Sequence, residues 1–145
     1  MPALLHHAGI ATGDDKMTTE LCMLACSVVL GLVQIALAAC GSTSQRGLAW
    51  AASARDGEAR PLTGVPARLA RASSNFLETF PLFAVAVLLA LALDRHTALT
   101  VLGAQLYFWA RLIYVPVYAA GIPYLRTMIW AVSMAGIVLV LAALF

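Results

Sequence analysis

One short stretch, RASSNFLETFPLF at 71–83, combines the polar residues Arg71, Asn75 and Glu78 with an apolar run. At 100° per residue these three side chains fall within about 60° of one another on a helix. A cation, an amide and a carboxylate on one face are groups that can bind a charged ligand through ion pairs and hydrogen bonds. We therefore interpret this stripe as one side of a candidate ligand site.

A second stripe lies in the apolar segment 98–121, where Tyr107, Arg111, Tyr114 and Tyr118 share one helix face by the same arithmetic. A charge inside such a segment needs an opposite charge. Glu78 is the only acidic residue that we place inside a long apolar segment. We therefore expect a Glu78 to Arg111 ion pair between two helices, with the two stripes facing one ligand site.

We expect these stripes to lie on membrane-spanning helices. The chain has 145 residues, of which 62% are hydrophobic and 11% charged, and its mean hydropathy is +0.89. A soluble domain of this size could not bury so much apolar surface. Four blocks reach the roughly 20 helical residues that cross a bilayer: 21–39, 76–93 with an extension to Pro66, 98–121 and 124–145. We predict an all-α membrane protein, a four-transmembrane-helix bundle formed by a single domain at 18–145.

Basic residues are distributed unevenly between the two sides of this bundle. One side has the arginines of the loop 41–65, the two arginines at the start of the helix that follows it (Arg68 and Arg71), and Arg126 after the connection between the third and fourth helices. The other side has only Lys16 and Arg95 as basic residues. Because basic residues favour the cytoplasmic side, we expect both termini on the non-cytoplasmic side of an integral, multi-pass membrane protein. We predict that residues 1–17, which lack the features of a signal peptide, are a disordered extension.

The histidines and cysteines of the chain do not have the spacing of a metal site or of a catalytic nucleophile. His6 and His7 lie in the expected N-terminal extension, and the cysteines at 22, 26 and 40 have no basic neighbour that would activate a thiol. We assign the cysteines to helix packing. We predict no metal site, and we expect no nucleic-acid partner.

The segments RLARASSNFLETFPLF and GAQLYFWARLIYVPVYAAGIPYLR resemble the membrane-associated proteins in eicosanoid and glutathione metabolism (MAPEG). This family includes microsomal glutathione transferases and microsomal prostaglandin E synthase. The similarity covers roughly 18–145 and rests on Arg-x3-Asn-x2-Glu-x2-Pro in the second helix with Ala-Arg-x2-Tyr-x3-Tyr in the third. It implies a homotrimer that binds glutathione in a cleft between neighbouring subunits, open to the cytoplasm.

The resemblance also implies roles for individual residues. Arg71, Asn75 and Glu78 would hold glutathione from the second helix, and Tyr114 and Tyr118 would contact it from the third. Thr79 follows Glu78 at a position where glutathione-binding members can carry a tyrosine, and Arg111 would be structural or bind a ligand carboxylate. Arg126 matches the arginine that stabilises the thiolate, so it is the expected catalytic residue.

The activity that follows from the resemblance is a glutathione transferase or peroxidase in the lipid bilayer. Glutathione would be the co-substrate, and the second substrate would be a lipophilic electrophile. A non-catalytic MAPEG-like scaffold or a lipid-binding protein is the alternative. A small multidrug transporter would need a carboxylate in the first helix, and we find none in the block 21–39.

Overall fold

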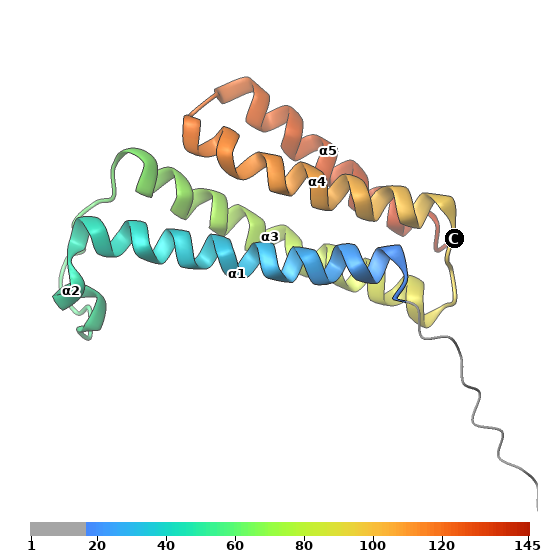
Figure 1. Ribbon diagram of the computed structural model, residues 1–145, viewed down its shortest axis with the longest axis horizontal. Helices are drawn as coiled ribbons and strands as arrows, with labels where there is room; N and C mark the ends of the chain where they lie inside the picture. Colours follow the sequence, from blue (N-terminus) through green and yellow to red (C-terminus); the bar gives the residue numbers. More distant parts are fainter. Residues whose placement is uncertain (1–16) are drawn as a thin grey trace, which may run out of the picture.

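The computed structural model describes residues 17–145, and four long helices account for most of them (Figure 1). These are α1 (Thr19–Arg46), α3 (Gly64–Ala92), α4 (Ala98–Ala120) and α5 (Pro123–Ala142), and a short α2 (Leu48–Ala52) follows α1. Each long helix has the length and composition to cross a membrane. The prediction of an all-α, four-helix membrane protein is confirmed. The predicted N-terminal extension lies, except for Met17, outside the described residues.

Helix α1 is longer at both ends than the apolar block from which it was predicted. It begins earlier because the Thr18 hydroxyl accepts a hydrogen bond from the backbone N–H of Leu21, 3.3 Å away. It continues through the polar residues after position 39 until Gly47, whose φ of +86° ends the helix. Helix α2, which was not predicted, starts directly after this glycine.

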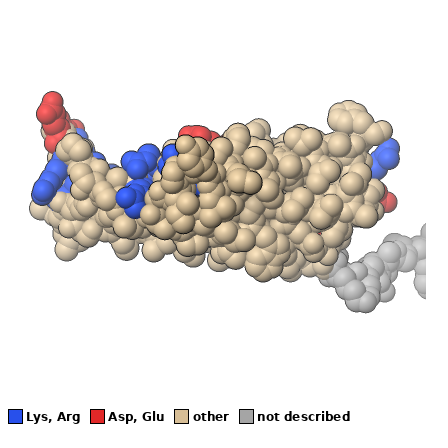
Figure 2. All heavy atoms as spheres, turned by 90° about the horizontal axis from the view of Figure 1, so that it is seen from above, with Lys and Arg blue, Asp and Glu red and all other residues tan. Residues whose placement is uncertain are grey.

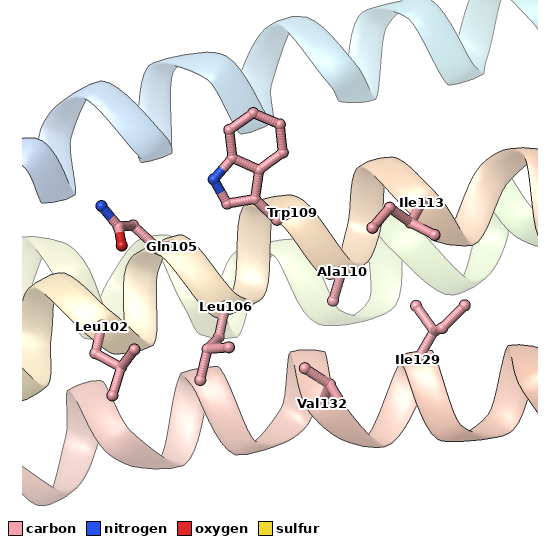
Figure 3. A pocket seen from close by; sticks show the side chains of 8 residues that line it. All are labelled: Leu102, Gln105, Leu106, Trp109, Ala110, Ile113, Ile129 and Val132. Carbon is pink, nitrogen blue, oxygen red and sulfur yellow. The ribbon is translucent and has the colours of Figure 1, made fainter.

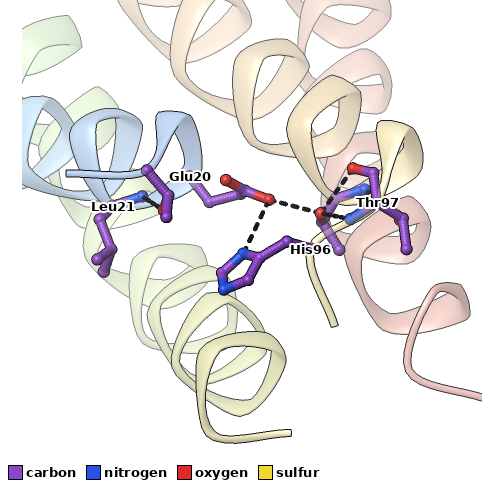
Figure 4. A network of polar contacts seen from close by, with 6 residues as sticks. Glu20, Leu21, His96 and Thr97 are labelled. Carbon is purple, nitrogen blue, oxygen red and sulfur yellow. Dashed lines mark hydrogen bonds and ion pairs between the residues drawn. The ribbon is translucent and has the colours of Figure 1, made fainter. Parts of the chain in front are cut away.

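The early start of α1 places Glu20 inside the first helix, and this corrects two expectations. Glu20 is only 3% exposed, so Glu78 is not the only acidic residue in a spanning helix, and the first helix does contain a carboxylate. The Thr100 hydroxyl donates to Glu20 Oε1 at 2.6 Å, and His96 Nδ1 lies 3.5 Å from the same oxygen (Figure 4). The network joins the start of α1 to the start of α4.

The helices pack as two antiparallel hairpins, one formed by α1 and α3 and the other by α4 and α5 (Figure 1). Helix α4 joins them by contacting both α3 and α1. The buried core lies where α3, α4 and α5 meet, and its centre is a stacked pair of rings, Phe83 and Tyr107, with centroids 4.0 Å apart. This arrangement aligns the polar residues of α3 and α4 along one shared interface.

The two ends of the bundle differ in composition. The connection that contains α2 and the connection between α4 and α5 lie at one end, whereas the α3–α4 connection and the C-terminus lie at the other (Figure 1). On the face that Figure 2 shows, most of the arginine side chains gather toward the first end, and few charges lie in the middle. The uneven distribution of basic residues in the sequence is therefore also a difference between the two ends of the structure.

The backbones of α4 and α5 touch at Gly103 and Gly136. A Cβ atom added to either glycine would lie 2.6 Å from the carbonyl oxygen of the other, which is closer than two such atoms can approach. Small residues allow transmembrane helices to come this close. The second hairpin therefore depends on the absence of a side chain at both positions.

We expect Gly136→Ala to lower the stability of the protein by about 1–3 kcal/mol, because the two backbones must separate to admit the methyl group. Thermal unfolding in detergent would measure the change. Gly57→Ala is the matched control, since its added Cβ would meet nothing nearer than the Trp50 ring at 3.9 Å. Equal melting temperatures for the two variants would contradict the close packing of α4 on α5.

Candidate functional site

A polar cavity of about 260 Å³ opens among α3, α4 and α5, near the end of the bundle where α4 passes into α5. Four residues that were predicted from the sequence line it together: Asn75 of α3, Tyr114 and Tyr118 of α4, and Arg126 of α5. Thr127 and Trp130 complete the lining. Residues from three helices thus form one site, and none of the described residues that line it is acidic.

The guanidinium of Arg126 is the charged group of this cavity. Its Cζ atom lies 5.0 Å from the centre of the Tyr118 ring, and that ring lies 5.3 Å from the ring of Tyr114. Arg126 belongs to the first turn of α5, where the helix dipole already contributes positive potential, so a cation there does not stabilise the helix. Both contributions favour an anion in the cavity.

Arg111 lies behind the cavity and is only 1% exposed. Its Nη1 donates to Asn75 Oδ1 at 2.7 Å, and its Nη2 donates to Thr79 Oγ1 at 2.6 Å. Its Cζ atom is 5.6 Å from the centre of the Tyr107 ring and 5.4 Å from that of Tyr114. Hydrogen bonds to neutral oxygens and contacts with two aromatic rings therefore surround this buried charge.

The expected ion pair between Glu78 and Arg111 is wrong for the single protomer. Glu78 is exposed and accepts only a long hydrogen bond, 3.4 Å, from the Ser74 hydroxyl. The reason is the rotation of α3: Thr79 faces Arg111, and the preceding residue points about 100° away from it. The side chains of Asn75 and Thr79, one turn apart, occupy the positions that we had expected the carboxylate to fill.

Arg71 is also exposed and does not line the cavity. The neighbouring Arg68, in contrast, donates from Nη1 to the carbonyl oxygen of Ala119 at 2.9 Å. This carbonyl belongs to the last turn of α4, where backbone acceptors have no partner within the helix and a cation is favourable. Arg68 thus holds the end of α4 against α3, whereas Arg71 and Glu78 remain on the outer face of α3.

Sequence reasoning missed three residues of this region, namely Thr79 as a partner of Arg111, and Thr127 and Trp130 as cavity residues. Helix periodicity could have found two of them. Thr79 is one turn beyond Asn75, and Trp130 is one turn beyond Arg126, so each shares a face with a predicted residue. Thr127 directly follows Arg126, so helix periodicity does not place it on the same face.

A second cavity, of about 390 Å³, lies between α4 and α5 (Figure 3). Leucine, isoleucine and valine side chains line most of it, together with Trp109 and the amide of Gln105. No charged side chain lines it. This cavity suits apolar molecules, and the polar cavity at Arg126 is the one that has the groups for chemistry.

Comparison with known proteins gives a match to a family model. The sequence model of the MAPEG family matches residues 23–145, which include every residue that lines the polar cavity. No curated protein and no solved structure matches the chain.

We expect Arg111→Lys to reduce stability by about 1.5–3 kcal/mol, because a single ammonium cannot replace two guanidinium nitrogens that bind different residues. Thermal unfolding in detergent would measure this loss. Arg60→Lys is the control in the exposed loop after α2, where a surface substitution changes stability by no more than about 0.5 kcal/mol. If Arg111→Lys melted with the wild type, the bridge would not contribute to the packing of α3 on α4.

Proposed function

The chain belongs to the MAPEG family, and from that premise we propose that it is a glutathione-dependent transferase or peroxidase of the membrane. Its second substrate is a lipophilic electrophile, and glutathione is the co-substrate. The observation that carries the proposal is the cavity in which Arg126, Tyr118 and Asn75 meet without any acidic lining residue. Such a cavity favours the thiolate form of a bound thiol.

Arg126 acts on the sulfur through its charge. A thiol of this type has a pKa of about 8.5 in water, so only a few per cent is thiolate at neutral pH. A guanidinium near the sulfur stabilises the thiolate and raises this fraction, but it stays protonated and cannot take the proton itself. Solvent at the open cavity accepts that proton. Arg126 is therefore the proposed catalytic residue in an electrostatic sense.

The chemistry that follows is nucleophilic attack by the sulfur. In a transfer reaction, a bond forms between the sulfur and an electrophilic carbon, and the leaving group departs with the bonding electrons. In a peroxidase reaction the sulfur attacks the terminal peroxide oxygen, the O–O bond breaks, and the alkoxide leaves and takes up a proton to become the alcohol. The sulfur is then a sulfenic acid, from which the thiol of a second glutathione displaces water to give glutathione disulfide. The apolar cavity between α4 and α5 would hold the lipophilic substrate.

The exposed positions of Arg71 and Glu78 support a homotrimer. Both lie on the outer face of α3, away from the cavity of their own protomer. A neighbouring protomer packed against α3 would bring its cavity to these side chains. Glutathione has two carboxylates and an ammonium group, which Arg71 and Glu78 would complement in an intersubunit cleft.

We expect Arg126→Ala to abolish the thiolate signal of bound glutathione and to reduce turnover on the order of 100-fold, because the charge that stabilises the sulfur is lost. Calorimetry and ultraviolet absorbance on detergent-purified protein would measure binding and thiolate together. The trimer and the melting temperature should stay unchanged, since Arg126 is half-buried at the end of the bundle.

A control variant and two contrary outcomes distinguish the proposed enzyme from a non-catalytic protein. Arg55→Ala removes an arginine from the loop after α2, outside the cavity, and should leave thiolate and turnover as in the wild type. Loss of the trimer in Arg126→Ala would contradict an electrostatic role for that residue. Absence of glutathione binding to the wild type at millimolar concentration would favour the non-catalytic scaffold or lipid-binding protein instead.

We also propose that both termini lie on the non-cytoplasmic side, because the arginine-rich end of the bundle favours the cytoplasm. In a variant without the native cysteines, Asp94→Cys tests the α3–α4 connection and Ser53→Cys tests the loop after α2. We expect a membrane-impermeant maleimide to label position 94 but not 53 in right-side-out vesicles. The opposite labelling pattern would reverse the topology.

A further inference from the structure

The hydrogen bond between Arg111 and Asn75 determines how the side-chain amide of Asn75 is oriented. A guanidinium has only donors, so the atom of Asn75 that lies 2.7 Å from Arg111 Nη1 must be the carbonyl oxygen Oδ1. The NH2 group of the same amide then points elsewhere. Among residues 17–145 it donates to no acceptor, although Asn75 lines the polar cavity.

Thr79 accepts the second hydrogen bond that the Arg111 guanidinium donates to α3. Because Arg111 Nη2 can only donate, Thr79 Oγ1 accepts, at 2.6 Å. The hydroxyl proton of Thr79 is then free to reach the carbonyl oxygens of Asn75 and Phe76, each 3.2 Å away. The donors that face Asn75 and Thr79 thus each have an acceptor, and reversing the Asn75 amide would place its NH2 group against Arg111 Nη1, two donors facing each other.

The guanidinium itself has little freedom to move. Tyr107 and Tyr114, both buried, place their rings on it, and the Phe83 ring stacks on Tyr107. A swing of Arg111 away from Asn75 would leave a buried charge with fewer partners, which is costly in a membrane protein. The orientation of the Asn75 amide is therefore imposed by the core of the bundle and not by the ligand.

We propose that Arg111 is a positioning residue that locks Asn75 with its NH2 group toward the cavity, so that Asn75 recognises a hydrogen-bond acceptor of the ligand, namely a carboxylate. The other polar groups of the cavity fit this assignment. Arg126 and the indole N–H of Trp130 can only donate, and the hydroxyl groups can do so as well. The inference deepens the proposed function: it assigns a carboxylate of glutathione, not its ammonium group, to this end of the cavity.

Asn75→Asp tests the polarity of this contact. Aspartate has the shape of asparagine and still accepts from Arg111, but it cannot donate to a ligand and it repels a carboxylate. We expect calorimetry to show at least tenfold weaker glutathione binding, equivalent to about 1.4 kcal/mol. Equal or tighter binding by Asn75→Asp would overturn the proposal, because Asn75 would then accept a hydrogen bond from the ligand or make none with it.

Melting temperatures test the lock without any ligand. Asn75→Asp turns the neutral contact with Arg111 into an ion pair and should melt at or above the wild type, whereas Asn75→Leu leaves Nη1 unpaired and should melt lower. An equal decrease in melting temperature in both variants would contradict a hydrogen bond between Asn75 and Arg111. If the wild type did not bind glutathione, the proposed function and the assignment of a glutathione carboxylate to Asn75 would both be wrong. The order of the melting temperatures would still show whether Arg111 holds the Asn75 amide.

Nuclear magnetic resonance gives a direct readout, because the chain contains a single asparagine. Protein labelled with nitrogen-15 only in asparagine shows one side-chain NH2 pair, which belongs to Asn75. We expect glutathione to shift this pair saturably in the wild type, and the shift to shrink in Arg111→Lys, where the lock is weakened. A glutathione complex, established by calorimetry, in which the pair does not move would contradict a hydrogen bond from Asn75.

Discussion

Desolvation of the Arg111 guanidinium is the constraint on which the centre of this bundle depends. A cation that is 1% exposed must find acceptors within the protein, and the acceptors that it has are side-chain oxygens of α3. The register of α3 against α4 is therefore tied to one side chain, since a shift of either helix by one residue would break both hydrogen bonds. The aromatic rings of α4 reinforce the same register by covering the guanidinium.

The polar contacts at the two ends of the bundle follow a related logic. At one end, Thr100 and His96 surround the buried carboxylate of Glu20; at the other, Arg68 of α3 binds the last turn of α4. Each contact joins a helix end to a helix that is distant in sequence. Backbone and charged groups that the membrane cannot solvate are thus satisfied by neighbouring helices, which also aligns the helices along their length.

Apolar contacts decide how closely the helices approach, and polar contacts decide how they are rotated. Gly103 and Gly136 let α4 and α5 touch, so that α5 carries Arg126 to the face of α4 that holds Tyr118. Rotation of α3 turns Asn75 and Thr79 inward and leaves Arg71 and Glu78 outside. The cavity is a consequence of both, because its lining comes from three helices at once.

The helical class, the four spans and the faces that carry polar residues could all be predicted, because hydropathy and helix periodicity depend only on local order along the chain. Periodicity places Asn75 and the tyrosines Tyr114 and Tyr118 on two stripes that face one site, and the resemblance to the MAPEG family adds Arg126 to it. The partners of Arg111, which are Asn75 and Thr79 and not Glu78, could not be predicted in this way, and neither could the burial of Glu20. Partner choice depends on how each helix is rotated about its axis, and that rotation comes from packing between distant segments, which a single sequence does not contain.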